Sequence, residues 1–392
     1  MFANPSHHVP LQPLSSNPAQ DVDPFQSLYD ALSNLTLDVT PSSATLDNGS
    51  RANSSHVPDT PAGVDSSRPS DIPVNLIFPS GDNVIFAHSS FFKHPCGADL
   101  PTPAAVRSEA ARLFEQGYLP VAATSRLVPF PSLGLLVKYG ADVSTTEAKC
   151  LLLLRRLLSS SVPVPEVFGW RRDGDERFIY MELPDGMTLE ERWAWMREAE
   201  RKLVYEELRG MVNEWRRLRQ GGREIVGSID NSPVRDGVFT SSQGTMKLPP
   251  AGPFADVAKF HSYFVATAVA ISECRQGGAE TGRVDYKPHH LLPNEVPIAF
   301  THGALHPRNV IVSRGPNPHI VSIIGWDQAG WYPAYWELCK ARMESSAHGD
   351  AIGWDERYVL GVLDLDRFEQ KNQGWNYGAL CQYWDYFVGL MR

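Results

Sequence analysis

Histidine, asparagine and aspartate side chains are concentrated in the segment FTHGALHPRNVIVS and in IIGWDQ, which follows it. They are His302, His306, Asn309 and Asp327. Imidazole, amide and carboxylate groups transfer protons or hold cations, so these residue types indicate a reactive or ligand-binding site. The two histidines have the i, i+4 spacing of zinc proteases, but the glutamate of H-E-x-x-H is absent and Pro307 disfavours a helix. The spacing therefore does not predict a zinc site, and we expect His302 to hold its loop by packing.

A lysine and a glutamate farther upstream form a second candidate group. Lys138 lies at the end of the apolar run LLVKYG, which predicts a strand, and Glu147 lies near the start of STTEAKCLLLLRRLL, which predicts a helix over 144–158. Ser or Thr at the helix cap and glutamate in the first turn are favoured by capping and by the helix dipole. Taken alone, Lys138 is typical of an exposed strand end, so a functional and a structural explanation both stay open.

HGALHPRN, followed by IIGWDQAGWYPAYWE, resembles the catalytic region of the aminoglycoside phosphotransferase and choline kinase-like family, particularly its fungal branch. The resemblance reaches back to VKYG and covers most of the chain beyond residue 80. It implies a bilobal, protein-kinase-like α+β fold that binds ATP between its lobes. It also makes Lys138 the phosphate-contacting lysine and Glu147 its ion-pair partner. Tyr180, Met181, Glu182 and Leu183 fall in the hinge, whose backbone groups meet the adenine ring.

The chain departs from that family's pattern at two positions. The Asp of H-G-D-x-H-P-x-N, which accepts the substrate proton, is replaced by Ala304, and the Asp of I-D-W-E, which binds magnesium, is replaced by Gly325. Phosphoryl transfer relies on carboxylates in both roles. Asn309 is retained, but it offers one neutral oxygen to a cation that prefers anionic ligands. In an extended segment Asp327 would point to the same side as position 325 and could replace the metal ligand, although a structural role is the simpler interpretation.

The elements that must position these residues change in character along the chain. VNLIFPSGDNVIFA predicts a β-hairpin, ATSRLVPFPSLGLLVKYG two strands with a proline-containing connection, and FIYMELPDG another strand. From Thr188 onward, TLEERWAWMREAERKLVYEELRGMVNEWRRLRQ predicts two helices and FADVAKFHSYFVATAVAISECRQ a third. The segment with His302 is expected to contribute to a central pair of short strands.

Composition and pattern divide the chain into three regions, and the resemblance implies the roles of the second and third. Residues 1–72 are dominated by Ser, Pro, Asn, Asp and Ala and bury too little apolar surface to offset the entropy of ordering, so we expect a disordered tail. Residues 73–183 are expected to form a small, mixed N-lobe that is nucleotide-binding-like. Residues 184–392 are expected to form a larger, mainly helical C-lobe with the degenerate catalytic loop and an acceptor pocket. Ligands bind in clefts of the kind that two such lobes leave between them.

Aromatic residues offer either core packing or ligand stacking. We interpret GWYPAYWE (330–337) as part of the core, because amphipathic aromatic side chains commonly pack there. Trp193, Trp195 and the C-terminal YWDYF are candidates for lining the acceptor pocket.

Composition excludes several classes of function. A formal net charge of −9 argues against a large nucleic-acid interface, which needs an excess of Lys and Arg. The five cysteines are scattered and form no C-x-x-C pair, which argues against a disulfide framework or zinc site and favours a reducing compartment. The first residues lack the pattern of a signal peptide, and no apolar run is long enough to cross a membrane. We therefore expect a cytoplasmic protein.

Loss of both carboxylates favours a pseudoenzyme that binds a nucleotide or a small metabolite. Any ATP binding is expected to be weak and largely independent of Mg²⁺, because Lys138 and Glu147 remain while the metal ligand does not. The expected partner is a small molecule, and the N-terminal tail offers a further place for a protein partner. Two alternatives stay open. One is a residual kinase that phosphorylates a hydroxyl group with help from Asp327; the other is a kinase-fold enzyme with ATP-independent small-molecule chemistry.

Overall fold

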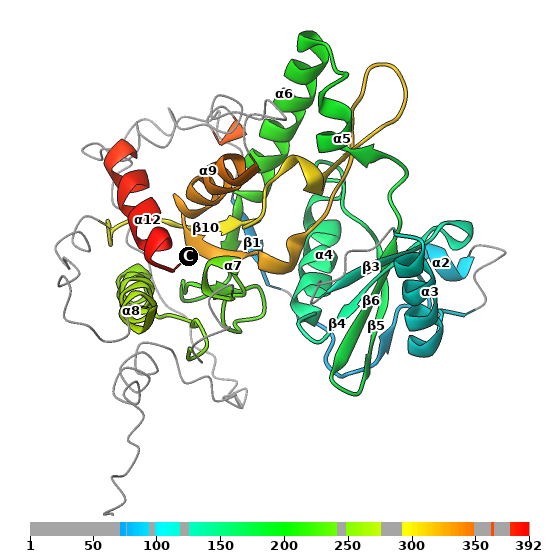
Figure 1. The fold of residues 1–392 in the computed structure, drawn as a ribbon, viewed down its shortest axis with the longest axis horizontal. Coiled ribbons are helices and arrows are strands. Elements are labelled where there is room, and N and C mark those ends of the chain that lie inside the picture. The colour runs from blue at the N-terminus through cyan, green and yellow to red at the C-terminus, as the bar shows by residue number, and fades with distance from the viewer. Residues whose placement is uncertain are drawn as a thin grey trace, which may run out of the picture.

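The computed structural model describes residues 71–75, 77–93, 99–117, 125–240, 248–275, 292–348, 362–363 and 377–391 (Figure 1). All but the last two residues of the expected tail, 1–72, lie outside these ranges, as does Cys96. No helix within them is long and apolar enough to cross a membrane. Helices and β-sheets both contribute extensively, which confirms the mixed α+β fold class.

A five-stranded antiparallel sheet forms the centre of the N-terminal part, in the order β2-β5-β6-β4-β3. Its strands are β2 (Val84–Ile85), β3 (Arg126–Phe130), β4 (Leu135–Gly140), β5 (Val167–Asp173) and β6 (Glu176–Glu182). The predicted pair of strands with a proline-containing connection is confirmed as β3 and β4, which a short 3-10 turn joins at Pro131–Leu133. The strand predicted in FIYMELPDG is confirmed as β6.

The two faces of this sheet are covered by different helices, α3 (Pro103–Glu115) and α4 (Thr145–Leu158), which lie on opposite sides in Figure 1. Successive side chains of a strand point to opposite faces. Leu135, Val137 and Tyr139 of β4 therefore pack in the cluster that contains the buried residues of α3. Leu136 packs on the other face, in the cluster that contains the buried residues of α4. Lys138, two residues after Leu136, is directed to that same face.

Helix α4 begins where the sequence predicts it. Ser144 is its N-cap, and the Ser144 hydroxyl accepts a hydrogen bond from the backbone N–H of Thr146. Buried leucine side chains on one side of α4 pack against the sheet. Packing therefore holds α4 in place in addition to its N-cap. Glu147, in the first turn, is consequently held next to β4.

The predicted hairpin over residues 74–87 is wrong. Strand β1 (Ile72–Val74) pairs in parallel with β8 (Leu218–Gln220), and β2 pairs with β5. Local alternation and turn residues correctly indicated extended structure, but they do not determine a strand's partner. Here each short strand gains hydrogen bonds from a distant segment and none from the other.

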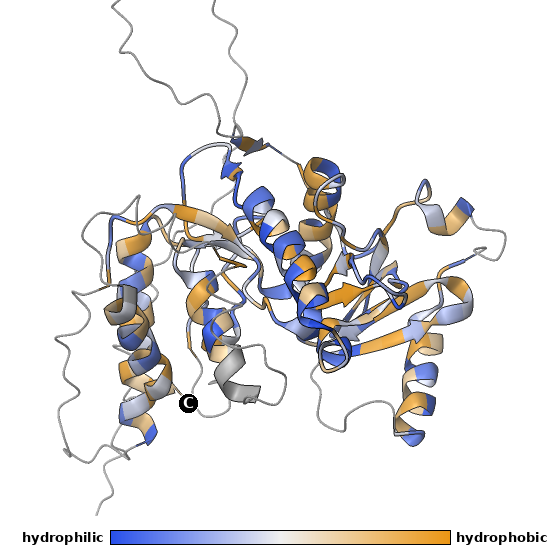
Figure 2. Cartoon of the chain, turned by 90° about the horizontal axis from the view of Figure 1, so that it is seen from above, coloured by the Kyte–Doolittle hydropathy of each residue, from blue (hydrophilic) through white to orange (hydrophobic). Residues whose placement is uncertain are grey.

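Among the described residues after β6, more lie in helices than in strands, as predicted. They are α5 (Leu189–Trp193), α6 (Glu198–Trp215), α7 (Gly237–Thr240), α8 (Val257–Arg275), α9 (Trp336–His348) and α12 (Tyr377–Met391). In Figure 1, α8, α9 and α12 lie on the side of the molecule away from the five-stranded sheet. The two helices predicted over 188–220 are confirmed as α5 and α6, and the third as α8. Figure 2 shows that both the strands and the helices carry hydrophobic and hydrophilic residues.

Short strands between these helices form two further sheets. The predicted central pair is confirmed as β11 (Val310–Val312) and β12 (Ile320–Ile323), to which β7 (Met187–Thr188) adds a third strand. A second sheet has β13 (Gly330–Pro333) between β10 (Ile298–Thr301) and β9 (Gly227–Ser228). The segment from β10 to β13 contains all the candidate site residues of the C-terminal half of the chain. The two sheets therefore fix the backbone path of this segment.

Aromatic residues fill the core between α8, α9 and α12. Trp336 is fully buried, and its ring contacts those of Phe239, Phe260, Phe264, Tyr332 and Trp384. The pairs with Phe260, Phe264 and Trp384 are edge-to-face and those with Phe239 and Tyr332 are stacked, and both arrangements allow large rings to pack tightly. The aromatic residues of GWYPAYWE are therefore core residues, as interpreted from the sequence.

Candidate functional site

Lys138, Glu147 and Asp327 meet in the structure, although they come from β4, from α4 and from the 3-10 turn Trp326–Gln328. The Nζ atom of Lys138 lies 2.7 Å from Oε2 of Glu147 and 3.4 Å from Oδ1 of Asp327. The ion pair between Lys138 and Glu147 is thus present. We call these three residues the charged triad.

Burial makes the charged triad electrostatically strong. The side chains of Lys138 and Glu147 are 12% and 5% exposed, whereas that of Asp327 is 46% exposed. Burial alone would lower the pKa of Lys138, but the carboxylates of Glu147 and Asp327 outweigh it and raise the pKa above its usual value. Burial pulls the pKa of Glu147 upward, against the Lys138 ammonium, which pulls it down. The 2.7 Å contact favours an ionised pair, because charge-assisted hydrogen bonds are short.

A buried carboxylate holds the loop after β10 through two hydrogen bonds. Glu337, at the start of α9, accepts hydrogen bonds from the backbone N–H groups of His302 at 2.6 Å and Gly303 at 3.1 Å. Gly303 has a φ of +78°, and an added Cβ would lie 2.8 Å from the carbonyl oxygen of Gln328, so this position requires glycine. The loop consequently has one well-defined course.

His302 holds that loop through both ring nitrogens. Its Nε2 contacts the carbonyl oxygen of Ile324 at 3.0 Å, and its Nδ1 lies 3.1 Å from the backbone N–H of Ala304. A backbone N–H donates and a carbonyl accepts, so the neutral tautomer protonated at Nε2 satisfies both contacts. Burial lowers the pKa of His302 to about 4, which keeps it neutral at pH 7. His302 therefore positions the loop.

Ala304, Asn309 and Gly325 line the same cavity as the charged triad. The Nδ2 group of Asn309 donates a hydrogen bond to the carbonyl oxygen of Ala304 at 2.7 Å. Gly325 has a φ of +77°, and a Cβ built on it would lie 2.8 to 2.9 Å from the amide atoms of Asn309. A side chain at 325 would thus require both a left-handed backbone and a shift of Asn309. No carboxylate stands at position 304 or 325.

The backbone that carries Asp327 has a different conformation from the expected one. The prediction assumed an extended segment after residue 325, and this assumption is wrong. Gly325 is left-handed, and Trp326–Gln328 form a 3-10 turn whose Trp326 is fully buried. Packing of that indole, together with the turn, directs Asp327 toward Lys138, where it forms the 3.4 Å contact.

Gln328 ties the same turn to a buried charge pair. Its Oε1 accepts hydrogen bonds from the N–H of Gly237 at 2.7 Å and from Nζ of Lys340 at 3.0 Å. Lys340 also donates to Asp236 at 2.9 Å, and both of these side chains are buried. The Nε1 group of Trp336 donates to the same carboxylate at 2.7 Å. These buried hydrogen bonds connect the turn to α7 and α9, so they help to fix the turn that carries Asp327.

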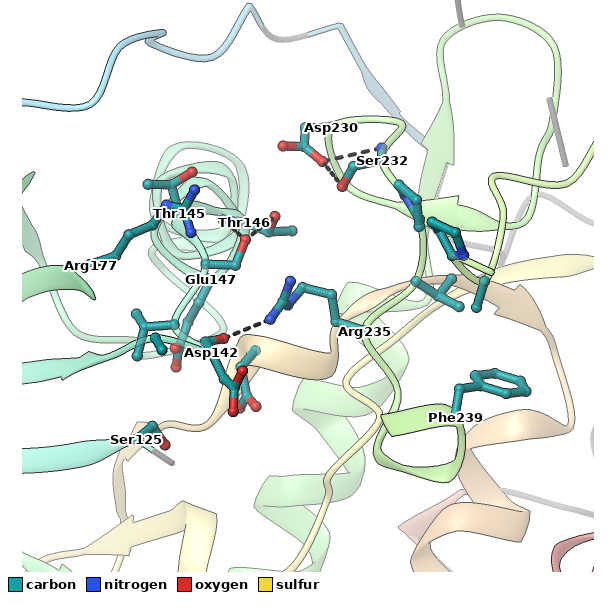
Figure 3. A pocket seen from close by; sticks show the side chains of 18 of the residues that line it. Ser125, Asp142, Thr145, Thr146, Glu147, Arg177, Asp230, Ser232, Arg235 and Phe239 are labelled. Carbon is teal, nitrogen blue, oxygen red and sulfur yellow. Dashed lines mark hydrogen bonds between the residues drawn. The ribbon is translucent and has the colours of Figure 1, made fainter. Parts of the chain in front are cut away.

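Two cavities border the charged triad. The larger, of about 900 Å³, lies between the start of α4 and the segment 230–235, and Figure 3 shows Arg235 donating a hydrogen bond across it to the backbone of Asp142. The smaller, of about 460 Å³, is bordered by β4, by Met181 and by the loop that carries Ala304. Ser125, Lys138, Glu147 and Asp327 line both cavities.

The predicted hinge contributes to the smaller cavity through one residue, Met181. Glu182 and Leu183 are not among the residues that line it. The backbone N–H of Glu182 donates to the carbonyl oxygen of Glu166 at 2.8 Å, and that of Leu183 donates to the carbonyl oxygen of Gly134 at 2.9 Å. Both N–H groups are therefore used within the protein.

The aromatic candidates for an acceptor pocket do not border either cavity. Trp193 is buried, where Arg201 lies over its ring, and Trp195 is 76% exposed. In the C-terminal YWDYF, Trp384 and Phe387 are core residues. Phe239 and Tyr263, which were not singled out from the sequence, line the larger cavity instead.

Sequence reasoning missed Glu337, Gln328, Asp236 and Lys340. Each is a polar residue whose importance depends on burial, and no spacing in the sequence marks it. The nearest signal is the glutamate at the end of GWYPAYWE, a charged residue inside an apolar run. Buried charges are almost always paired, so such a residue indicates a long-range partner without identifying it.

Comparisons with known proteins give one family and several structures. Residues 141–370 match the model of the phosphotransferase enzyme family. An aminoglycoside-3'-phosphotransferase of type VIII has 15% identity and a TM-score of 0.41, over 73% of this chain and 99% of that chain. Aminoglycoside phosphotransferase APH(4)-Ia has 14% identity and a TM-score of 0.38, over 72% and 99%. APH(3'')-Id from Streptomyces rimosus has 13% identity and a TM-score of 0.40, over 73% and 97%.

No curated protein sequence matches the chain. The family match includes α4 with Glu147, the loop with His302 and the turn with Asp327, while Lys138 lies just before it. Because this match spans more than half of the 392 residues, the chain belongs to the phosphotransferase enzyme family.

Proposed function

We propose that this chain is an aminoglycoside phosphotransferase-like pseudoenzyme, which has lost efficient ATP-dependent phosphoryl transfer and binds a nucleotide or small metabolite beside the charged triad. One observation carries the proposal. The Lys138–Glu147 pair and two cavities of about 460 and 900 Å³ are retained, while positions 304 and 325 carry no carboxylate. Cavities of this size accommodate small organic ligands. The scaffold therefore supports binding better than it supports the family reaction.

Magnesium and ATP are the cofactors that the family implies, and the residues present do not fit Mg²⁺. Asn309 offers a neutral amide oxygen, whereas the carboxylate of Asp327 is directed toward Lys138. Among the residues that the structure describes, no three His, Cys, Asp or Glu side chains are grouped so as to hold a metal ion. Mg²⁺ demands near-octahedral oxygen coordination and is usually held with carboxylates. Any nucleotide that binds here is therefore expected to bind weakly and without dependence on Mg²⁺.

The position of Asp327 favours ATP-independent chemistry as a second candidate function. Its half-exposed carboxylate lines both cavities and lies beside the Lys138 ammonium. A carboxylate next to a bound molecule accepts protons, so Asp327 is suited to general-base chemistry on a small metabolite. A residual kinase has less support, because the same carboxylate would have to leave Lys138 to hold a metal ion.

The test is phosphoryl transfer by the full chain to a panel of hydroxyl-bearing metabolites, with ATP and Mg²⁺ and with Lys138→Met as the control. A missing general base alone costs about 10² to 10⁴ in rate, so we expect no transfer above background. Robust transfer by the unmodified chain that requires both ATP and Mg²⁺ would refute the proposal. The double variant A304D/G325D tests the two positions together, since either carboxylate alone lacks its partner.

A further inference from the structure

The connector that follows β6 offers no backbone donor to a purine ring over three successive residues. The N–H groups of Glu182 and Leu183 donate to Glu166 and Gly134, at 2.8 and 2.9 Å. Pro184, the next residue, has no N–H group. The Watson–Crick edge of adenine carries an acceptor at N1, which needs such a donor. A ring bound beside Met181 would leave that acceptor without a partner, and unmade hydrogen bonds in a buried site reduce affinity.

The polar end of the smaller cavity is equally unsuited to a phosphate chain. Asp327 lies against Lys138, so one side of the ammonium already faces a carboxylate in addition to Glu147. Phosphate and carboxylate oxygens both accept hydrogen bonds at pH 7 and repel one another. Arg126 and Arg308 also line this cavity, so its cationic side chains outnumber Glu147 and Asp327 and its net charge favours an anion. Only at the Lys138 ammonium, where both carboxylates already lie, is a phosphate group opposed.

Between these two ends the cavity is mainly apolar. Its walls come from both sides of the cleft: the strands β3 and β4, the helix α4 and the segment before Gly325. The apolar lining residues are Leu127, Leu136, Leu151, Pro165, Met181, Ala304 and Ile324. A volume of about 460 Å³ suits a compact organic molecule, whose apolar surface would supply most of the affinity.

We propose that the smaller cavity binds a non-nucleotide molecule with a compact apolar body and a hydroxyl or ammonium group that donates a hydrogen bond to Asp327. A hydroxyl or ammonium group can donate to a carboxylate where a phosphate cannot. This inference rests on the proposed loss of phosphoryl transfer and specifies the ligand chemistry of the same cleft. Asp327, which lines the cavity, is the residue that discriminates against phosphate groups.

Ligand-observed NMR on the full chain tests this chemistry with three probes that share an indole ring. Tryptophol carries a hydroxyl group, tryptamine an ammonium group and indole-3-propionate a carboxylate. We expect the two donor probes to bind about ten-fold more tightly than the carboxylate, and adenosine to bind more weakly than either donor probe. Asp327→Asn should remove most of the preference for tryptamine over indole-3-propionate. Failure of both donor probes to bind, or an unchanged preference in Asp327→Asn, would overturn the proposal.

Adenosine carries no phosphate group, so its affinity tests the connector separately from the polar end of the cavity. Pro184→Ala restores one N–H group, and we expect it to strengthen adenosine binding about three- to ten-fold, the gain of one hydrogen bond. Pro165→Ala is the control, because it trims a proline that lines the smaller cavity without changing the connector. Adenosine that binds the unmodified chain more tightly than the donor probes contradicts this inference. The proposed function fails on a different result, ATP-dependent phosphoryl transfer.

Discussion

Replacing Lys138 by methionine should destabilise the protein strongly, because it leaves Glu147 buried without its cation. The two side chains are 12% and 5% exposed, and their charged atoms lie 2.7 Å apart. Removing one partner of such a buried pair costs about 3 to 5 kcal/mol in the free energy of unfolding. Asp327 cannot compensate, since it carries the same charge as Glu147. The loss should be larger at pH 8 than at pH 5, because an unpaired buried carboxylate is stabilised by protonation.

A double-mutant cycle separates the pair from the loss of the lysine side chain itself. Lys138→Met combined with Glu147→Gln removes both charges, so we expect it to recover more than half of the stability lost in Lys138→Met. Lys202 and Glu206 provide the matched control, because they form a Lys–Glu pair at 3.9 Å with side chains 73% and 55% exposed. Lys202→Met should cost less than about 1 kcal/mol.

Urea unfolding followed by tryptophan fluorescence measures these differences, and the slope of free energy against urea should stay unchanged. A cost of less than about 1 kcal/mol for Lys138→Met, similar to that of Lys202→Met, would refute the reasoning. It would mean that water reaches the pair and that burial does not decide its strength. A large cost would show that the fold by itself has a reason to keep this pair, whether or not a nucleotide binds.

Two further outcomes follow from buried groups elsewhere. Burial lowers the pKa values of His302 and His261 to about 4, below the ordinary value of 6.5. Folded-state pKa values that are lowered give stability that is present above pH 6.5 and lost as the pH falls toward 4. Unfolding at pH 5 should therefore show a loss of about 2 kcal/mol per histidine relative to pH 7, and a flat profile would contradict it. Glu337→Gln should weaken one of the two bonds to the loop N–H groups and cost about 1.5 to 3 kcal/mol, with faster amide exchange at Gly303 as the local readout; unchanged exchange there would show that Glu337 does not hold the loop.

Local signals in the sequence were sufficient for several elements. The Ser144 cap and the leucine pattern predicted α4, and the apolar run before Lys138 predicted β4. These signals work because capping and side-chain periodicity act over a few residues. The Lys138–Glu147 contact was expected from the resemblance to a known family, since neither residue by itself indicated it.

Tertiary structure decided which segments meet across long distances. The sequence indicated extended structure near Ile72 and Val84 but not that these strands pair with β8 and β5. The sequence indicated Asp327 as a candidate, but the extended backbone expected around it was wrong. A left-handed Gly325 and the burial of Trp326 determine the turn that is found there.

The residues that hold the site in place could not be predicted from the sequence, for the same reason. Glu337 and Gln328 matter because of partners that lie far from them in the chain or in another element, such as His302 and Gly237. A carboxylate or amide is identical in the sequence whether it lies in solvent or in the core. Its free energy differs by several kcal/mol between the two, and only the packed fold decides which environment it occupies. The sequence by itself determined residue types and local elements, whereas burial and long-range pairing determined what those residues do.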